Sequence, residues 1–437
     1  MNKKQLFILP LLLFSLATQA EDDQWSDSEG GSDWGNEKWG EESWNESSST
    51  PLFTGFVEAG YSGWINDSVN HSDRPLEEIR WRLERADNFN GFKTTVYSDI
   101  TYDGVTDKTE IKLREFNLQF SLTDSIDTKL GRQILTWGTG DLIFINDLFP
   151  KDWQSFFNGR DDEYLKAPSD AAKVSFYSPG FNWDWIVTPE FDKDNFLSGE
   201  RFSSYSPQTQ SIAQPESPFS SDTSTDNDYE VSTRIFGIKG SKEWAIYGYR
   251  GFYKTPDSVS EANTPMHSRM NALGASLRMP LGKGLWNIET GYYQSVEDEN
   301  GDNPRVPNDE IRLLTGYEME IVKNLTAAAQ FYLEKTQDYQ QQQQHSYAPV
   351  QERSEYYEML TLRLTHLAMR QNLTSSLFIF YSPDEEDGHL RLKAEYRIND
   401  NWKIAAGSNV FFGEKDYTFW GQLDENDNLW MRIRYSY

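Results

Sequence analysis

The 437-residue sequence contains no cysteine and, after residue 20, no stretch that approaches 18 consecutive apolar residues. The first absence excludes disulfides, and the second excludes a transmembrane helix beyond residue 20. Only 37% of the residues are hydrophobic, yet aromatic residues reach 15%. A globular core in a chain of this length would need more leucine, isoleucine and valine. Many aromatic and few aliphatic residues are typical of a membrane β-barrel, where apolar residues occupy alternate positions and aromatic residues gather at the interfaces.

The first 20 residues have the pattern of a secretory signal peptide. Lys3 and Lys4 precede an apolar run at 6–16, and small residues follow at 17–20. A membrane-spanning helix is the alternative, but it needs about 20 apolar residues, more than this run contains. We therefore expect residues 1–20 to be a signal peptide that is cleaved after Ala20.

Residues 21–50 form an acidic leader that carries four spaced tryptophans, Trp25, Trp34, Trp39 and Trp44. Its high charge and low aliphatic content predict disorder. The leader is either simply unfolded or a periplasmic tail whose tryptophans dock a partner. The net charge of −28 argues against a nucleic-acid partner.

From residue 51 to 437 the chain alternates between short runs of two-residue periodicity and turn-rich gaps. In the run 390–398, every second residue is apolar and most of the intervening ones are charged, which is the pattern of a strand with one apolar face. We count 18 such runs, centred near residues 57, 81, 97, 115, 130, 174, 186, 235, 248, 274, 290, 315, 328, 361, 376, 393, 406 and 432.

A soluble β-sandwich would also show this alternation, but two features favour an outer-membrane barrel. Short gaps alternate with long ones, as periplasmic turns alternate with external loops in an up-and-down barrel. The last run, 429–437, has an apolar face and ends on Tyr437. Left unpaired, it would be an aggregation hazard, whereas in a closed barrel it pairs with the first strand. We expect an all-β, antiparallel transmembrane barrel of 18 strands in the bacterial outer membrane.

The segment 137–170 is too apolar for a solvated external loop. Inside a barrel it can fold into the lumen and bury its apolar residues against the wall. We expect it to narrow the lumen; a loop that only caps the barrel for stability is the alternative. The constriction residues are then Trp137, Asp141, Asp147, Arg160, Asp161 and Asp162.

If the apolar faces point to lipid, the opposite faces line the lumen. The pore-lining residues predicted in this way are Arg80, Arg82, Glu84, Arg312, Arg391, Lys393, Arg397, Arg432 and Arg434. Barrel closure would bring several of these arginines together as a basic patch that favours an anionic solute. Alternatively, the arginines pair with Glu58, Glu84, Glu318 and Glu395 and stiffen the wall.

The sequence offers no constellation for catalysis. Its five histidines, His71, His267, His345, His366 and His389, accompany no GxSxG turn, no HExxH motif and no closely spaced ligand set. Three of them, His71, His345 and His389, fall in or beside predicted loops, where a solvated side chain is expected. We therefore expect neither an enzyme nor a cofactor, and no transition-metal site.

The segment Gly131-Arg132-Gln133-Ile134-Leu135-Thr136-Trp137-Gly138 resembles a strand-and-loop element of the larger porin-like outer-membrane families. These families include the alginate-export channels and a related uncharacterised family. Strict alternation places Arg132 on the lipid-facing side, so we expect a bulge near Gly131.

The expected function is a passive channel for diffusion or export of a hydrophilic solute, with a small anionic solute as one candidate. A barrel that anchors loops or a periplasmic tail, as an adhesin does, is the alternative. The expected partners are outer-membrane lipid and lipopolysaccharide, the barrel-assembly machinery at the C-terminal strand, and a periplasmic partner of the leader.

Overall fold

The computed structural model describes residues 53–197, 199–206, 209–213, 220–225, 228–262, 264–346 and 354–437. The predicted signal peptide and acidic leader lie outside these residues. Within the described part, no helix is long and apolar enough to cross a membrane.

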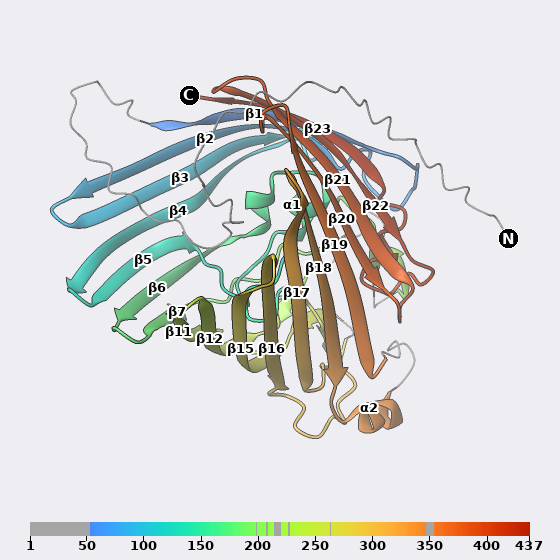
Figure 1. Cartoon of the computed structure of the whole chain (residues 1–437). Helices are drawn as coiled ribbons and strands as arrows, with labels where there is room; N and C mark the ends of the chain where they lie inside the picture. The colour runs from blue at the N-terminus through green and yellow to red at the C-terminus, as the bar shows by residue number, and fades with distance from the viewer. Residues whose placement is uncertain are drawn as a thin grey trace. The chain divides into compact units, whose positions relative to one another are not determined.

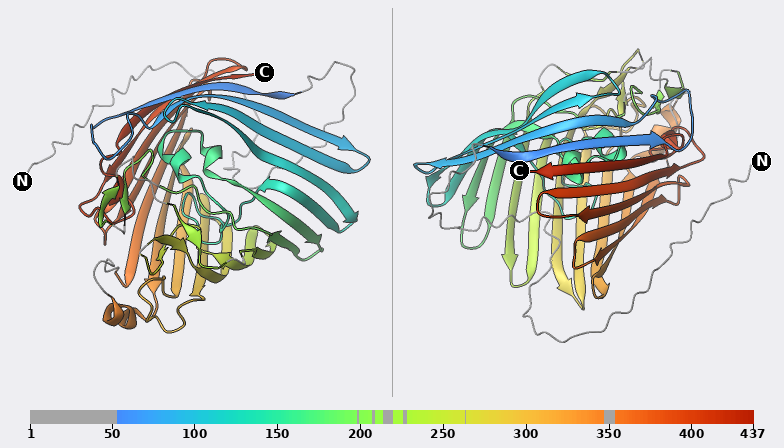
Figure 2. Two further views of the ribbon diagram at one scale, coloured as in Figure 1. Left: turned by 180° about the vertical axis from the view of Figure 1, so that it is seen from behind. Right: turned by 90° about the horizontal axis from the view of Figure 1, so that it is seen from above.

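Eighteen antiparallel strands form one closed barrel, as the periodicity predicts (Figures 1 and 2). Each predicted run coincides with one barrel strand. The barrel strands are β1 (Thr54–Trp64), β2 (Leu76–Phe89), β3 (Phe92–Asp103), β4 (Lys108–Thr123), β5 (Ile126–Ile134), β6 (Pro168–Tyr177), β7 (Asn182–Thr188), β11 (Glu230–Lys239), β12 (Lys242–Phe252), β15 (Arg269–Leu281), β16 (Gly284–Ser295), β17 (Glu310–Val322), β18 (Leu325–Thr336), β19 (Tyr356–Ala368), β20 (Leu373–Ser382), β21 (Asp387–Arg397), β22 (Trp402–Phe412) and β23 (Asn428–Ser436).

The connections alternate in length around the barrel. Two residues, Asn90 and Gly91, join β2 to β3, whereas residues 135–167 join β5 to β6 and residues 189–229 join β7 to β11. The end with short turns faces the periplasm in barrels of this type. The connections contain short elements of their own: α1 (Trp153–Phe157), η1 (Asp162–Leu165), β8 (Ser204–Ser206), β9 (Ser211–Ala213), β10 (Asp222–Thr223), β13 (Ser258–Val259), β14 (Pro265–His267), α2 (Tyr339–His345) and η2 (Gly421–Leu423).

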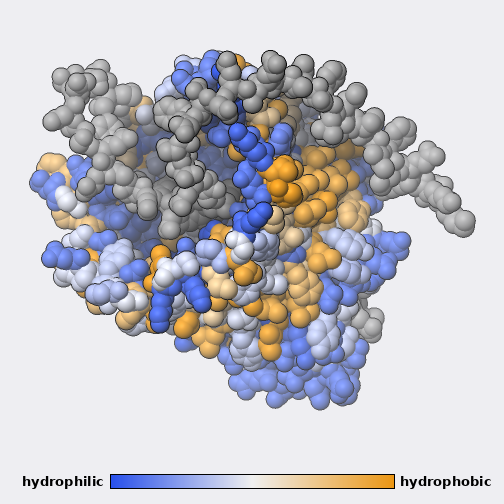
Figure 3. Space-filling view, in the orientation of Figure 1, coloured by the Kyte–Doolittle hydropathy of each residue, from blue (hydrophilic) through white to orange (hydrophobic). Residues whose placement is uncertain are grey.

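The two faces of the wall differ in polarity because successive side chains of a strand point to opposite sides. On β1, Val57 and Tyr61 are exposed on the outer surface, whereas Glu58 and Ser62 are buried on the lumen side. In Figure 3, hydrophobic atoms cover much of the outer face of the strands, and hydrophilic atoms gather around α2. The outer face is therefore suited to lipid and the inner face to polar contacts.

The barrel closes where β23 pairs with β1, with Glu58 opposite Arg434 and Phe56 opposite Ser436. Figure 2 shows the first and last strands side by side. The C-terminal side chain adds to this seam: the Trp81 indole donates to the Tyr437 hydroxyl at 2.7 Å, and that hydroxyl donates to a backbone carbonyl of β2 at 3.0 Å. The predicted pairing of the aromatic C-terminal strand with the first strand is confirmed.

The bulge expected near Gly131 is absent, and that prediction is wrong. The pairing of β5 with β4 and with β6 runs through Gly131 and Arg132 without a register shift. Arg132 keeps its lipid-facing position because Asp170 on β6 takes up its charge, at 3.0 Å and 2.7 Å from two guanidinium nitrogens. Gly131 is required for another reason: its φ is +109°, and a Cβ there would lie 2.3 Å from the carbonyl oxygen of Phe116.

We predict that Gly131→Ala lowers barrel stability more than Gly91→Ala. Both glycines have positive φ, but a Cβ at Gly91 meets no atom within 4 Å. Backbone strain of this kind costs about 1–3 kcal/mol, and only Gly131 adds a clash with backbone. The temperature at which the refolded barrel loses its folded mobility in SDS gels measures the effect. Equal transition temperatures for the two variants would contradict the close approach at Gly131.

Candidate functional site

The connection between β5 and β6, residues 135–167, folds into the barrel; we call it the inner loop. Its helix α1 lies inside the ring of strands in Figure 2. Ile145, Phe156 and Phe157 of the inner loop are almost fully buried in a hydrophobic cluster with lumen-side residues such as Tyr293 and Phe411. Burial of these side chains drives the loop inward because they would otherwise face water.

The first part of the inner loop binds the wall formed by β16 to β19. Glu289 on β16 accepts hydrogen bonds from the backbone of Thr139 at 2.7 Å and from the backbone and amide of Asn146 at 2.8 and 2.9 Å. Asp141 forms an ion pair with Arg363 on β19 at 2.9 Å. The side-chain amide of Gln330 on β18 accepts a hydrogen bond from the backbone N–H of Asp141 and donates one to its backbone carbonyl.

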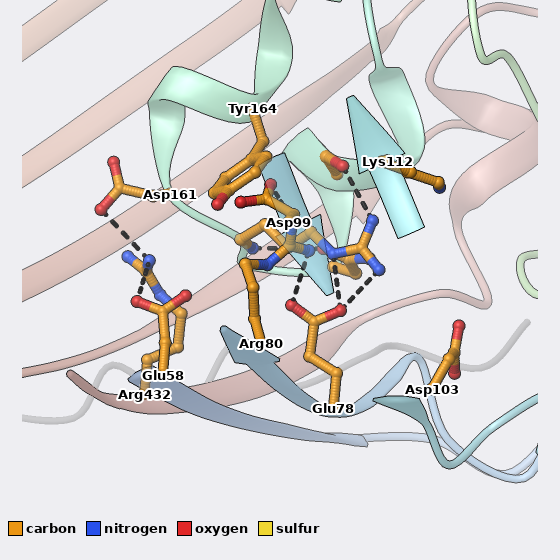
Figure 4. A network of polar contacts seen from close by, with 12 residues as sticks. Glu58, Glu78, Arg80, Asp99, Asp103, Lys112, Asp161, Tyr164 and Arg432 are labelled. Carbon is orange, nitrogen blue, oxygen red and sulfur yellow. Dashed lines mark hydrogen bonds and ion pairs between the residues drawn. The ribbon is translucent and has the colours of Figure 1, made fainter. Parts of the chain in front are cut away.

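The far end of the inner loop binds the wall next to the seam. Asp161 lies 3.2 Å from Arg432, 3.3 Å from Arg434 and 3.8 Å from Lys403. Glu58 on β1 pairs with the same two arginines, at 3.3 and 2.8 Å. Figure 4 shows Arg432 between Glu58 and Asp161. Arg432 and Arg434, two members of the predicted basic patch, are thus both paired with carboxylates of the loop and the wall.

The next residue of the inner loop extends this network to β21. Asp162 lies 2.5 Å from Arg391 and 3.1 Å from Lys393. Burial alone would raise the pKa of Asp162, but Arg391 and Lys393 outweigh burial and hold the pKa at about 2. Burial also disfavours the charged form of Asp161, but the nearby cations of β21 to β23 favour it more strongly. The pKa of Asp161 therefore lies far below its usual range. Both carboxylates therefore stay ionised at neutral and mildly acidic pH.

A second group of arginines holds the returning arm of the inner loop. Asp99 on β3 accepts from Arg80 at 3.0 Å and from Arg82 at 2.6 and 3.0 Å. Arg82 also donates to the hydroxyl of Tyr164 at 2.6 Å, and the Arg80 guanidinium stacks 4.0 Å from the Tyr164 ring centre. Arg160 makes two bonds to Glu78, at 2.9 and 2.6 Å. Figure 4 shows Tyr164 above Arg80 and Asp99.

The remaining predicted residues take less central positions. Glu84 lies 3.6 Å from Arg82, and Arg312 pairs with Glu310 and Glu334 on its own side of the barrel. Trp137 packs on Phe149 and Tyr247, and Asp147 pairs with Lys151 inside the loop. Arg397 is exposed at the turn end of β21.

A cavity of about 230 Å³ lies between the inner loop and the wall formed by β2 to β4. Arg80, Asp99, Thr101 and Arg114 line it from the strands. The inner loop contributes residues of 152–164, and the connection after β7 contributes Asn195, Glu200 and Arg201. This connection is tied down at Arg201, which donates to the carbonyl of Pro75 at 2.9 Å and pairs with Asp103.

Two residues of the lumen differ from the sequence prediction. Arg114 and Glu115 are adjacent on β4, yet both point into the lumen. This is possible because a β-bulge shifts the register of the β3–β4 pairing between Tyr97 and Ser98. Strict alternation could not find this residue. His389 was expected to be solvated, which is wrong: it is fully buried on β21 and stacks on Phe411 with ring centres 4.4 Å apart.

Among the described residues, no group of three or more histidine, aspartate and glutamate side chains is placed to hold a metal ion.

Three crystal structures share this fold. Acinetobacter baumannii OccAB3 superposes with a TM-score of 0.52 at 9% identity, over 88% of this chain and 98% of its own. Pseudomonas aeruginosa OccD3 gives 0.53 at 9% identity over 88% and 90%, and P. aeruginosa OccK2, in complex with glucuronate, gives 0.50 at 10% identity over 88% and 95%. No protein-family model matches the sequence, and no curated protein matches it.

The closed barrel, its apolar outer face and the inner loop together define the class: the chain is an outer-membrane β-barrel with a porin-like fold. The resemblance to the alginate-export channels remains a prediction that rests on the segment 131–138.

We predict that Asp141→Asn is more stable than wild type and that this advantage is larger at pH 7.5 than at pH 4.5. Burial raises the pKa of Asp141 to about 6, above its value in the unfolded chain. Between about pH 4 and 6 the folded state therefore binds a proton that the unfolded chain has released, and stability is lost as the pH rises from about 4 to about 6. The variant should gain up to about 3 kcal/mol on wild type at pH 7.5 and only about 1 kcal/mol at pH 4.5.

The midpoint of thermal unfolding, measured at both pH values, reports this difference. Asp400→Asn, in the exposed turn between β21 and β22, is the control and should shift the midpoint equally at both. A difference between Asp141→Asn and wild type that does not depend on pH would refute the assignment.

Proposed function

We propose that the protein is a passive channel for small hydrophilic solutes, with the inner loop as its constriction. One observation carries the proposal: the inner loop crosses the lumen, is bound to the far wall by ion pairs, and leaves a charged cavity beside β2 to β4. Selection would be steric and electrostatic, without covalent chemistry. The predicted pore-lining and constriction residues act in this proposal mainly as the anchors that set the width of the passage.

A preference for anionic solutes is the finer part of the proposal. Most lumen arginines are paired with carboxylates, so the basic patch at the seam offers little free charge. Arg114 differs because, among the described residues, its guanidinium donates its hydrogen bonds to backbone carbonyls, at 3.0 and 3.1 Å. The similar fold of OccK2, whose crystal structure contains glucuronate, is consistent with an acidic solute but shares only the architecture.

The other partners remain proposals as well. The barrel-assembly machinery would recognise β23 by its apolar face and terminal aromatic residue. The exposed outer face of the barrel would contact lipid and lipopolysaccharide. An anchor or adhesin that carries no solute is the competing function.

The double variant Asp161→Asn with Asp162→Asn should raise single-channel conductance in planar bilayers by about twofold or more, because it removes the charges that hold the loop against β21 to β23. Asp87→Asn with Asp400→Asn is the control, since both residues are exposed and lie away from the inner loop, near the short turns. In a salt gradient across the same bilayers, the sign of the reversal potential of the wild-type channel should indicate selectivity for anions. Cation selectivity would refute the finer proposal, and no conductance from any form would favour the anchor.

A further inference from the structure

The connection between β7 and β11 reaches across the external mouth of the barrel. We call its described residues 194–197 and 199–206 the strap. The strap starts near the end of β7, yet it contacts the β1–β2 connection (65–75) and the β22–β23 connection (413–427). In the ring of 18 strands, six strand-to-strand steps separate β7 from β1, and one more leads to β23. Because the strap also lies on the inner loop, it passes over the lumen and does not follow the rim.

The near end of the strap is bound to the inner loop through the backbone and one carboxylate. Asn195 forms a parallel bridge with Asp152, and its N–H donates to the carbonyl of Lys151 at 2.8 Å. The carboxylate of Asp194 accepts from the backbone N–H of Lys151 and from the indole of Trp153, both at 2.8 Å. This end of the strap therefore forms one unit with the inner loop.

The far end of the strap is bound to side chains of the β22–β23 connection. The backbone N–H of Ser203 donates to the side-chain oxygen of Asn426 at 2.9 Å, and the N–H of Tyr205 donates to that of Gln422 at 3.2 Å. A neutral hydrogen bond of this kind contributes only about 0.5–1.5 kcal/mol, because water can replace either partner. The far end is therefore easier to release than the near end, where a buried carboxylate is bound.

The middle of the strap covers the cavity beside β2 to β4. Glu200 and Arg201 line that cavity, and Arg201 is tied to β3 through its ion pair with Asp103. Phe202 is 1% exposed and packs edge-on against Trp64, with ring centres 5.6 Å apart. The strap thus forms the external side of the cavity.

We propose that the strap is a lid over the external mouth, closed in this structure, and that a solute enters when the far end of the strap leaves the β22–β23 connection. The inference rests on the proposed channel function and adds a gate to the constriction at the inner loop. The near end stays on the inner loop, as the hinge side of a lid does. Opening disrupts the packing of Phe202 and the ion pair of Arg201, so the closed state predominates.

The test is single-channel recording of the full chain with the lid locked or free. The protein has no cysteine, so Ser203→Cys with Asn426→Cys introduces its only two thiols. Bridging them with a short, reducible bis-methanethiosulfonate reagent should lower the open probability at least tenfold, and reductant should restore it. An open probability that does not change on bridging would overturn the lid.

Ser68→Cys with Glu425→Cys is the matched control. The native side chains of this pair are hydrogen-bonded to each other and join the β1–β2 and β22–β23 connections without the strap. Bridging this pair should leave the open probability unchanged. Equal losses in the two bridged pairs would make the stiffness of the β22–β23 connection responsible and would overturn the role of the strap.

A labelling experiment tests the lid without conductance. Lys112 on β4 lines the cavity, and its side chain is 57% exposed. A polar maleimide added outside intact cells should label Lys112→Cys at least fivefold faster when Asn426→Ala is also present. Asn66→Ala is the control, because Asn66 also binds the β22–β23 connection, at Asp427, but not the strap. Equal rates in all three proteins would contradict the lid, whereas faster labelling of a barrel that never conducts would keep the lid and remove the channel function.

Discussion

Opposite charges that meet inside the barrel decide where the inner loop lies. Asp161 and Asp162 reach the wall at a region where Arg391, Arg432 and Glu58 are almost entirely removed from solvent. Moving such charges out of water is costly, and their mutual attraction offsets the cost only when each has a partner. The loop and the wall therefore stabilise each other, because without the loop the buried arginines at the seam would lack enough carboxylates to pair with.

This dependence shapes the lumen. The ion pairs cancel most of the positive charge of β21 to β23, and the aromatic cluster around Phe157 and His389 fills space on the same side. The charged cavity lies between the inner loop and β2 to β4. The arginines of β21 to β23, which the sequence suggests as a selectivity filter, thus chiefly hold the inner loop in place. The cavity beside β2 to β4 is instead lined by Arg114.

Periodicity could predict the strands because each run has one lipid face and one lumen face, and closure by the last strand followed from its apolar face. The inward loop could also be predicted, since the apolar stretch around Phe144 had no other place to be buried. The partners of each arginine could not, because Asp161 is far in sequence from Arg432 and Arg434. Arg114 and His389 were missed for local reasons: a bulge interrupts the alternation at the first, and loop aromatics cover the second.

The most direct test of the attachment is a charge exchange at one contact, read as single-channel conductance. Asp162→Arg alone and Arg391→Asp alone each place like charges together, and each should raise the conductance. The double exchange restores an opposite pair at the same place, 2.5 Å apart in the native protein, and should return the conductance to the wild-type value. A double variant that conducts no closer to wild type than either single variant would contradict the account.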